Sequence, residues 1–334
     1  MSITSWLRKR TSSSRSRGTG QRRPCFRPQL EALDGRIVPS TLTVTNNLDD
    51  GSAGTLRYEI GKAHKGDTIK FAPKLDGQTI WLNGSELDIT KSLTIQGPGA
   101  DQLTIDGSGS FGSRVFEVAA KTNVTLSGLT ISDGYGIAAR GYLYPDDAKG
   151  GGILNFGTLT VSGCTISDNS SYGYDNNGYG GGIYNAGTLT VSNSTVFSNS
   201  TENPAPWGNS TNAAYGGGIY NTGTLIVTSS TVSGNVAEYG GGIYSAGAGT
   251  VSNSTLSGNI ADFEGGGIYN SGTLTVTGCT VSGNYAGYLN GGAGIYNAGT
   301  LTVSNSAFSG NIDAPDYLDN IYGPYVDGGG NSFS

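Results

Sequence analysis

The side chains of this sequence that could do chemistry together lie between positions 140 and 175. They are two basic residues and three carboxylates: Arg140, Asp146, Asp147, Lys149 and Asp175. Clustered carboxylates can bind Ca²⁺, and a neighbouring arginine or lysine can act as a general base. Such a set could abstract a proton from a carboxylated substrate. No recognisable catalytic motif surrounds these residues, so we favour surface charges over a catalytic site.

Other catalytic chemistries lack the side chains that they need. His64 is the sole histidine, and no arginine or lysine follows Lys149. Zinc sites, phosphate-binding loops and Ser-His-Asp arrangements are therefore absent from the sequence. A mechanism with two carboxylates stays open, although Asp168 and Asp175 are loosely placed for it. We predict no metal site and no cofactor, with Ca²⁺ as the one option left open.

A second set of candidate residues is aromatic and recurs at one position of a repeat. Each tyrosine stands between an isoleucine and an asparagine or serine, and with Trp207 they are the candidate ligand-binding residues: Tyr184, Tyr220, Tyr244, Tyr269 and Tyr296. If the isoleucines point inward, the tyrosines form an exposed column with a spacing of about 4.8 Å. The column could stabilise a sheet face by ring stacking, or it could form an aromatic track for sugar rings.

The repeat that carries these tyrosines predicts the fold. Six near-copies of G-G-G-I-Y-N-x-G-T-L-T-V-S-x-S-T-V-S-G-N begin at Gly150, Gly180, Gly216, Gly240, Gly265 and Gly292. A unit this short cannot bury its own apolar face, so the copies must stack. Apolar residues alternate within each unit, as strands require. We predict an all-β, right-handed, single-stranded parallel β-helix with three strands in each coil.

Asparagines recur at two further positions of the repeat. The first set would point inward and form a ladder, interrupted by Ser245: Asn155, Asn185, Asn221, Asn270 and Asn297. The second set follows the third strand, and we interpret it as turn chemistry. A leucine-rich repeat and a calcium-binding nonapeptide roll lack their defining motifs here. Regular Ile, Leu and Val positions argue against a low-complexity linker.

The chain divides into a leader and a solenoid. Residues 1–40 are predicted to be a basic, disordered export or targeting leader, and residues 41–334 the β-helix. Within the β-helix we expect a capping helix at 51–66, degenerate coils at 67–149, regular coils at 150–312 and a closing coil at 313–334. Insertions at 134–149, 170–179 and 200–215 would emerge on one side and carry many aromatic residues.

Charge and cysteine content narrow the partners. The 334-residue chain has a net charge of −6, and residues 150–334 contain acids but no lysine or arginine. An acidic solenoid argues against nucleic-acid binding along the repeats. No apolar run is long enough to span a membrane, and we expect a monomer. Cys164 and Cys279 share one repeat position four coils apart, too far for a disulfide.

Three stretches resemble known families. Pro28–Ser40 (P-Q-L-E-A-L-D-G-R-I-V-P-S) resembles the segment that ends the leaders of planctomycete extracellular proteins, with Gly35 in place of an acid. Gly54–Phe71 resembles the opening of right-handed β-helix surface proteins. The G-G-G-I-Y-N and S-G-N units resemble repeats of the pectin-lyase-like superfamily and those of chlamydial polymorphic outer-membrane proteins.

The resemblance implies export to the cell surface or the extracellular space, in association with the outer membrane. It also implies that a binding cleft would lie along the first sheet of the β-helix. We expect a non-catalytic protein that adheres to, or binds glycans of, a polysaccharide or cell-envelope partner through this face and its flanking loops. The alternative is a calcium-dependent polysaccharide lyase, or a glycoside hydrolase, acting in the same groove.

Overall fold

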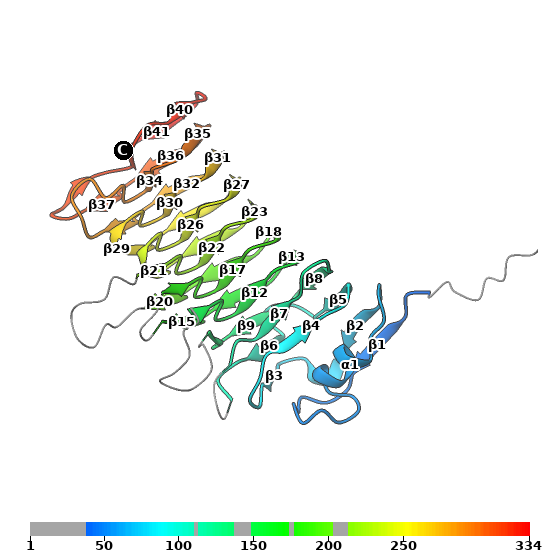
Figure 1. The fold of residues 1–334 in the computed structure, drawn as a ribbon. Helices are drawn as coiled ribbons and strands as arrows, with labels where there is room; N and C mark the ends of the chain where they lie inside the picture. The colour runs from blue at the N-terminus through cyan, green and yellow to red at the C-terminus, as the bar shows by residue number, and fades with distance from the viewer. Residues whose placement is uncertain (1–37, 110–112, 137–147, 174–176, 203–212) are drawn as a thin grey trace, which may run out of the picture. The chain divides into compact units, whose positions relative to one another are not determined.

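The protein is a stack of β-coils with the chain rising one coil at a time (Figure 1). The computed structural model describes residues 38–109, 113–136, 148–173, 177–202 and 213–334. Among these residues, the strands form four sheets, which we name A to D and which are parallel except for one antiparallel pair near the C-terminus. A regular coil visits sheets C, A, B and D in that order. This architecture confirms the predicted right-handed parallel β-helix.

Sheets C and A hold the first and second strands of each repeat. Sheet C contains β4 (Leu87–Ile89), β7 (Phe116–Val118), β12 (Ile153–Asn155), β17 (Ile183–Asn185), β22 (Ile219–Asn221), β26 (Ile243–Ser245), β30 (Ile268–Asn270), β34 (Ile295–Asn297) and β39 (Ile321–Tyr322). Sheet A contains β1 (Thr41–Val44), β2 (Thr68–Phe71), β5 (Leu93–Gln96), β8 (Asn123–Ser127), β13 (Thr158–Ser162), β18 (Thr188–Ser192), β23 (Thr224–Thr228), β27 (Ala248–Ser252), β31 (Thr273–Thr277), β35 (Thr300–Ser304) and β40 (Val326–Asp327).

Sheets B and D hold the third and fourth strands. Sheet B contains β3 (Gln78–Trp81), β6 (Leu103–Asp106), β9 (Thr130–Ser132), β14 (Thr165–Ser167), β19 (Thr195–Phe197), β24 (Thr231–Ser233), β28 (Thr255–Ser257), β32 (Thr280–Ser282), β36 (Ala307–Ser309) and β41 (Ser332–Phe333). Sheet D contains β10 (Tyr135–Gly136), β11 (Ala148–Lys149), β15 (Ser170–Tyr172), β16 (Gly178–Tyr179), β20 (Ser200–Glu202), β21 (Ala214–Tyr215), β25 (Val236–Tyr239), β29 (Ile260–Glu264), β33 (Tyr285–Ala286), β37 (Ile312–Asp313) and β38 (Tyr317–Leu318).

Sheet D is formed by a fourth strand in each coil, which we did not predict from the sequence. Each coil enters sheet D after a residue in the left-handed conformation, such as Asp168 (φ 58°) or Gly234 (φ 62°). This residue turns the chain at the end of sheet B. The expected insertions therefore enter and leave through paired strands: Ser170 pairs with Ser200, and Tyr179 pairs with Tyr215. Short runs of small and polar residues hid these strands, because they lack the apolar alternation of the other three.

Identical residues stack in register through the coils and build the core. Ile153 pairs with Ile183, which pairs with Ile219, and all three are fully buried. Leu and Val of sheet A and the β-branched residues of sheet B form matching buried columns. Each column removes apolar surface from water only because the neighbouring coil covers it, so stacking is the source of stability.

Two asparagine ladders line the interior. In the first, Nδ2 of Asn155 donates to Oδ1 of Asn185 at 2.7 Å, and Asn185 donates to Asn221 at the same distance. This confirms the predicted inward ladder. The second set is more than turn chemistry, because its side chains are also buried and bonded from coil to coil, as Asn199 Nδ2 to Asn235 Oδ1 at 2.9 Å.

The triple glycine that opens each repeat is required by crowding between sheets D and C. Gly180 has a φ of 65°, and a Cβ there would lie 2.3 Å from the carbonyl oxygen of Ile183. A Cβ at Gly181 would meet the carbonyl oxygens of Ser200 and Gly217 at 2.1 and 2.6 Å. A side chain would crowd the neighbouring coil, which accounts for glycine at this corner in every regular coil but the last, where Ala293 takes the middle position.

The N-terminal end is capped by a helix shorter than the predicted 51–66. Helix α1 (Leu56–Lys62) begins after Thr55, whose Oγ1 accepts from the backbone N–H of Tyr58, and it buries Leu56 and Ile60. A 3₁₀ turn, η1, follows at Pro73–Leu75. No helix within the described part of the chain is long and apolar enough to cross a membrane.

Candidate functional site

The tyrosines predicted from the repeat form a stacked column on sheet C, which we call the first ladder. Its successive members, on β17, β22, β26, β30, β34 and β39, are Tyr184, Tyr220, Tyr244, Tyr269, Tyr296 and Tyr322. Their ring centroids are 5.4, 5.2, 4.7, 5.0 and 5.4 Å apart, and their planes differ by only 6–21°. The tyrosine rings are therefore stacked on one another from coil to coil.

A second ladder runs beside the first on sheet D. Tyr179, Tyr215 and Tyr239 stack at 5.4 Å per step, with interplanar angles of 12° and 20°. Phe263 and Tyr288 extend the column with tilted rings. The register places Lys149 of β11 directly before Tyr179, so a cation occupies the first position of this column.

The two ladders interlock across the glycine corner. Tyr215 meets Tyr244 edge-on at 5.1 Å, and Tyr239 meets Tyr269 edge-on at 5.8 Å. Both ladders together form a strip of rings that we call the aromatic strip. Because each interior ring has neighbours on both sides and across the corner, the predicted exposed column is half-buried. Its ring faces are shared with other rings rather than open to solvent.

Burial also governs the electrostatics of the strip. Burial raises the pKa of Tyr220 and Tyr269 well above the usual range, with the neighbouring tyrosines adding to the effect. Burial likewise raises the pKa of Glu238 and of Glu264. Burial and the nearby Glu264 carboxylate raise the pKa of Tyr296. The strip thus combines neutral phenols with carboxylates at its sheet D margin.

Toward the N-terminus the outward column of sheet C changes from aromatic to charged. Pairing places Asp88, Glu117, Leu154 and Tyr184 at successive levels of the column. Arg114 lies beside it, with Nη1 3.2 Å from Oε2 of Glu117. We call Asp88, Arg114, Glu117 and Lys149 the charged end.

Burial and neighbouring groups determine the pKa values and contacts of the charged side chains at this end. Arg114 donates from Nη2 to the carbonyl oxygen of Lys149 at 2.8 Å, and burial lowers the pKa of its guanidinium. Burial raises the pKa of Glu117, while Arg114 opposes that shift. The ammonium of Lys149 lies 5.8 Å from the ring centroid of Tyr184, over the ring that ends the first ladder.

The structure locates the predicted catalytic candidates only in part. Lys149 lies at the junction between the charged end and the aromatic strip. The remaining candidates, and the ligand-binding candidate Trp207, lie outside the described residues: Arg140, Asp146, Asp147 and Asp175. Arg114 and Glu117 were missed, although aligning Phe116–Val118 with the later I-Y-N strands would have placed Glu117 in the tyrosine column.

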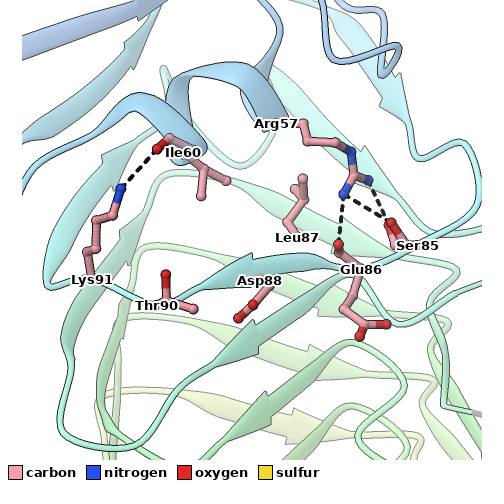
Figure 2. Close-up of a pocket in the computed structure, with 9 residues that line it drawn as sticks. Arg57, Ile60, Ser85, Glu86, Leu87, Asp88, Thr90 and Lys91 are labelled. Atoms are coloured by element: carbon pink, nitrogen blue, oxygen red, sulfur yellow. Dashed lines mark hydrogen bonds between the residues drawn. The ribbon is translucent and has the colours of Figure 1, made fainter.

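A separate cleft of about 400 Å³ lies between α1 and β4, and Asp88 reaches it from the charged end (Figure 2). Its cations are engaged with backbone oxygens: Arg57 donates to Ser85 and Glu86, and Lys91 donates to Gly61 and Ala63. These bonds join the cap to the first coil, so we interpret the cleft as a structural seam. No group of three His, Cys, Asp or Glu residues among those described could hold a metal ion.

Comparisons with known proteins identify the fold. No protein-family model matches the sequence, and a search of curated proteins finds no match. Among solved structures, pectate lyase Pel9A superposes with a TM-score of 0.54 at 14% identity, covering 90% of this chain and 77% of that one. An alginate lyase from Paenibacillus covers 85% of this chain and 99% of its own, at 14% identity and a TM-score of 0.41.

A third similar structure is the pectin methylesterase PemA from Erwinia chrysanthemi. It shares 14% identity, covers 85% of this chain and 80% of its own, and has a TM-score of 0.38. At 14% identity, the superposition on the pectate lyase shows a similar architecture and carries no information on activity. Together with the strand order and register, it shows that the chain has the right-handed parallel β-helix fold of pectin-lyase-like proteins.

Proposed function

We propose that this chain is an exported, surface-located protein that binds a polysaccharide along the aromatic strip without cleaving it. The observation that carries the proposal is the pair of interlocked ladders, of which the first runs along sheet C from Tyr184 to Tyr322 and the second along sheet D. A polymer of repeating sugars can meet a periodic surface at several levels at once, so weak contacts add. The fold is one in which polysaccharide-acting proteins occur.

The chemistry of the strip favours a neutral polysaccharide. Carboxylates accept hydrogen bonds from sugar hydroxyls, and Glu238 and Glu264 lie at the margin of the strip. No lysine or arginine follows Lys149 in the sequence, so an acidic polymer would meet uncompensated negative charge along the repeats. A carboxylated polymer would require bridging cations.

The ring geometry specifies how contact would occur. Interior rings have stacked neighbours on both sides, so we expect sugar contacts at ring edges and phenolic hydroxyls. Tyr184 differs because Lys149 lies over its ring, and Phe156 is a tilted neighbour at 6.4 Å. This end of the ladder adds a cation to the contact surface.

A second candidate function is a calcium-dependent polysaccharide lyase or a glycoside hydrolase acting at the charged end. Arg114, Glu117 and Lys149 gather at one end of the strip, and the pectate lyase superposes over most of the chain. Against it, the Arg114 guanidinium is bonded to Glu117 and to backbone oxygens, which leaves it poorly placed to accept a proton.

One experiment separates the two functions. The full chain is incubated with Ca²⁺ and a panel of neutral and acidic polysaccharides, and retention on each polymer and the mass of soluble products are measured together. We expect retention on at least one neutral polymer and no products. Unsaturated or water-added oligosaccharides would establish an enzyme and overturn the non-catalytic proposal. Absence of both retention and products with every polymer would reject both functions.

A further inference from the structure

Two aspartates fasten the last coil to the loop that precedes β34. Asp313 is 1% exposed, and its Oδ2 accepts from the backbone N–H of Asn290 at 2.6 Å. Oδ2 of Asp319 accepts from the backbone N–H of Gly292 at 2.8 Å. The two carboxylates thus hold neighbouring backbone groups of one loop, and this brings them together at the side of the solenoid.

One oxygen of this pair has no partner. Oδ1 of Asp313 is the single buried side-chain nitrogen or oxygen among the described residues that makes no hydrogen bond. The charge of Asp313 acts on the Asp319 carboxyl, so the two side chains lie close together. Ionised carboxylates only accept hydrogen bonds, so neither can satisfy the other. A buried, unpaired carboxylate oxygen is costly, and it indicates a group that the protein side chains do not supply.

The surrounding residues provide no neutralising charge. The sequence has no lysine, arginine or histidine after Lys149, and Asp316, in the turn between β37 and β38, is a further carboxylate. Tyr317, which pairs with Asp313 across that turn, is not a basic residue. Burial and the nearby Asp313 raise the pKa of Asp319, as expected for two like charges facing each other.

We propose that Asp313 and Asp319 bind a calcium ion that clasps the C-terminal coil to the 287–292 loop. Ca²⁺ takes six to eight oxygen ligands in flexible geometry, so two carboxylates can be completed by backbone carbonyls and water. Mg²⁺ fits less well because it demands near-ideal octahedral geometry and gives up its waters reluctantly. With only two carboxylates, we expect a dissociation constant of about 10⁻⁴–10⁻³ M.

The test is the thermal midpoint of the full chain in chelator and in millimolar Ca²⁺, with equal Mg²⁺ as the ionic control. We expect Ca²⁺ to raise the midpoint of the wild type by about 2–4 °C. In chelator, Asp313→Asn should be at least as stable as the wild type, because the new amide N–H can donate to the neighbouring Asp319 carboxylate. This variant should not respond to Ca²⁺. The matched control, Asp262→Asn, removes an exposed carboxylate of β29 and should respond like the wild type.

Several results would overturn the assignment. They are an unchanged wild-type midpoint in Ca²⁺, an equal effect of Mg²⁺, or an equal response of Asp313→Asn to Ca²⁺. Terbium luminescence provides a second readout that does not depend on stability. We expect Tb³⁺ bound to the wild type to be displaced by Ca²⁺, and its signal to be lost in Asp319→Asn. A full signal in that variant would contradict the site.

Discussion

The ammonium of Lys149 lies 5.8 Å from the ring centroid of Tyr184, where the first ladder meets the charged end. Lys149 also pairs with Tyr179, the first ring of the second ladder. A single cation therefore stands at the head of both aromatic columns. Beyond it the solenoid carries only acids, so this position is electrostatically distinct from the rest of the strip.

Replacing Lys149 tests whether the head of the strip contributes to binding. Lys149→Met keeps the apolar stem but removes the charge and the cation–π contact, which contributes about 0.5–1 kcal/mol at an exposed site. We expect retention on a bound polysaccharide to weaken about two- to tenfold, because one hydrogen-bond donor to the polymer, worth about 0.5–1.5 kcal/mol, is lost. Lys149→Arg should retain binding. Equal retention of the Met variant and the wild type would exclude this residue from the contact surface.

Tyr244 tests the energetic role of the first ladder. It stacks on Tyr220 at 5.2 Å and on Tyr269 at 4.7 Å. Tyr244→Ala removes both contacts and a half-buried ring, so we expect a loss of about 2–4 kcal/mol in the free energy of unfolding. Tyr244→Phe keeps the rings and should change it by less than about 1 kcal/mol. Chemical denaturation measures both, and a stable alanine variant would show that stacking contributes little.

Ser245 offers a stabilising substitution. It interrupts the first asparagine ladder, and Nδ2 of Asn221 reaches its Oγ at 3.3 Å. The neighbouring coils hold asparagine at this position, Asn221 and Asn270, so the local backbone accepts it. Ser245→Asn can receive the bond from Asn221 and donate to Asn270. We expect a gain of about 1 kcal/mol in unfolding free energy. A lower thermal midpoint would mean that the larger side chain does not fit.

Stability should fall as pH rises from weakly acidic to neutral. Burial raises the pKa of Glu117, Glu238 and Glu264 in the folded chain above the ordinary carboxyl range. Between the ordinary and the raised values the folded state holds more protons than the unfolded state, so protonation favours folding. In chelator, the thermal midpoint should be higher at about pH 5 than at about pH 7.5. The opposite trend would contradict these shifts.

Sequence periodicity predicted sheets A, B and C because their apolar alternation is explicit, as in Leu189 and Val191. It missed sheet D, where small residues such as Ser171 pair through their backbones and give no hydrophobic signal. The tyrosine column was predicted, but Tyr179 and Tyr215 of the second ladder were placed in insertions. The contact between the two ladders depends on the fold of the glycine corner, and periodicity carries no information on that geometry.

The residues of the charged end were also difficult to predict from the sequence. Glu117 occupies the tyrosine column only because β7 pairs with β12, and the degenerate coil around Phe116 obscures that register in the sequence. Arg114 acquires its role from contacts with Glu117 and with the carbonyl oxygen of Lys149, which are remote or irregular in sequence. Residues placed by long-range pairing were therefore the ones that the sequence concealed.

The most direct test of polysaccharide binding by the aromatic strip is affinity electrophoresis of a double variant, Tyr220→Phe with Tyr244→Phe, in gels containing a polymer that retains the wild type. This variant keeps the stacked rings and removes two hydroxyls. Tyr58→Phe with Tyr325→Phe, which alters tyrosines outside both ladders, is the matched control. We predict weaker retention of the ladder variant and unchanged retention of the control. Wild-type retention of the ladder variant would contradict binding at the strip.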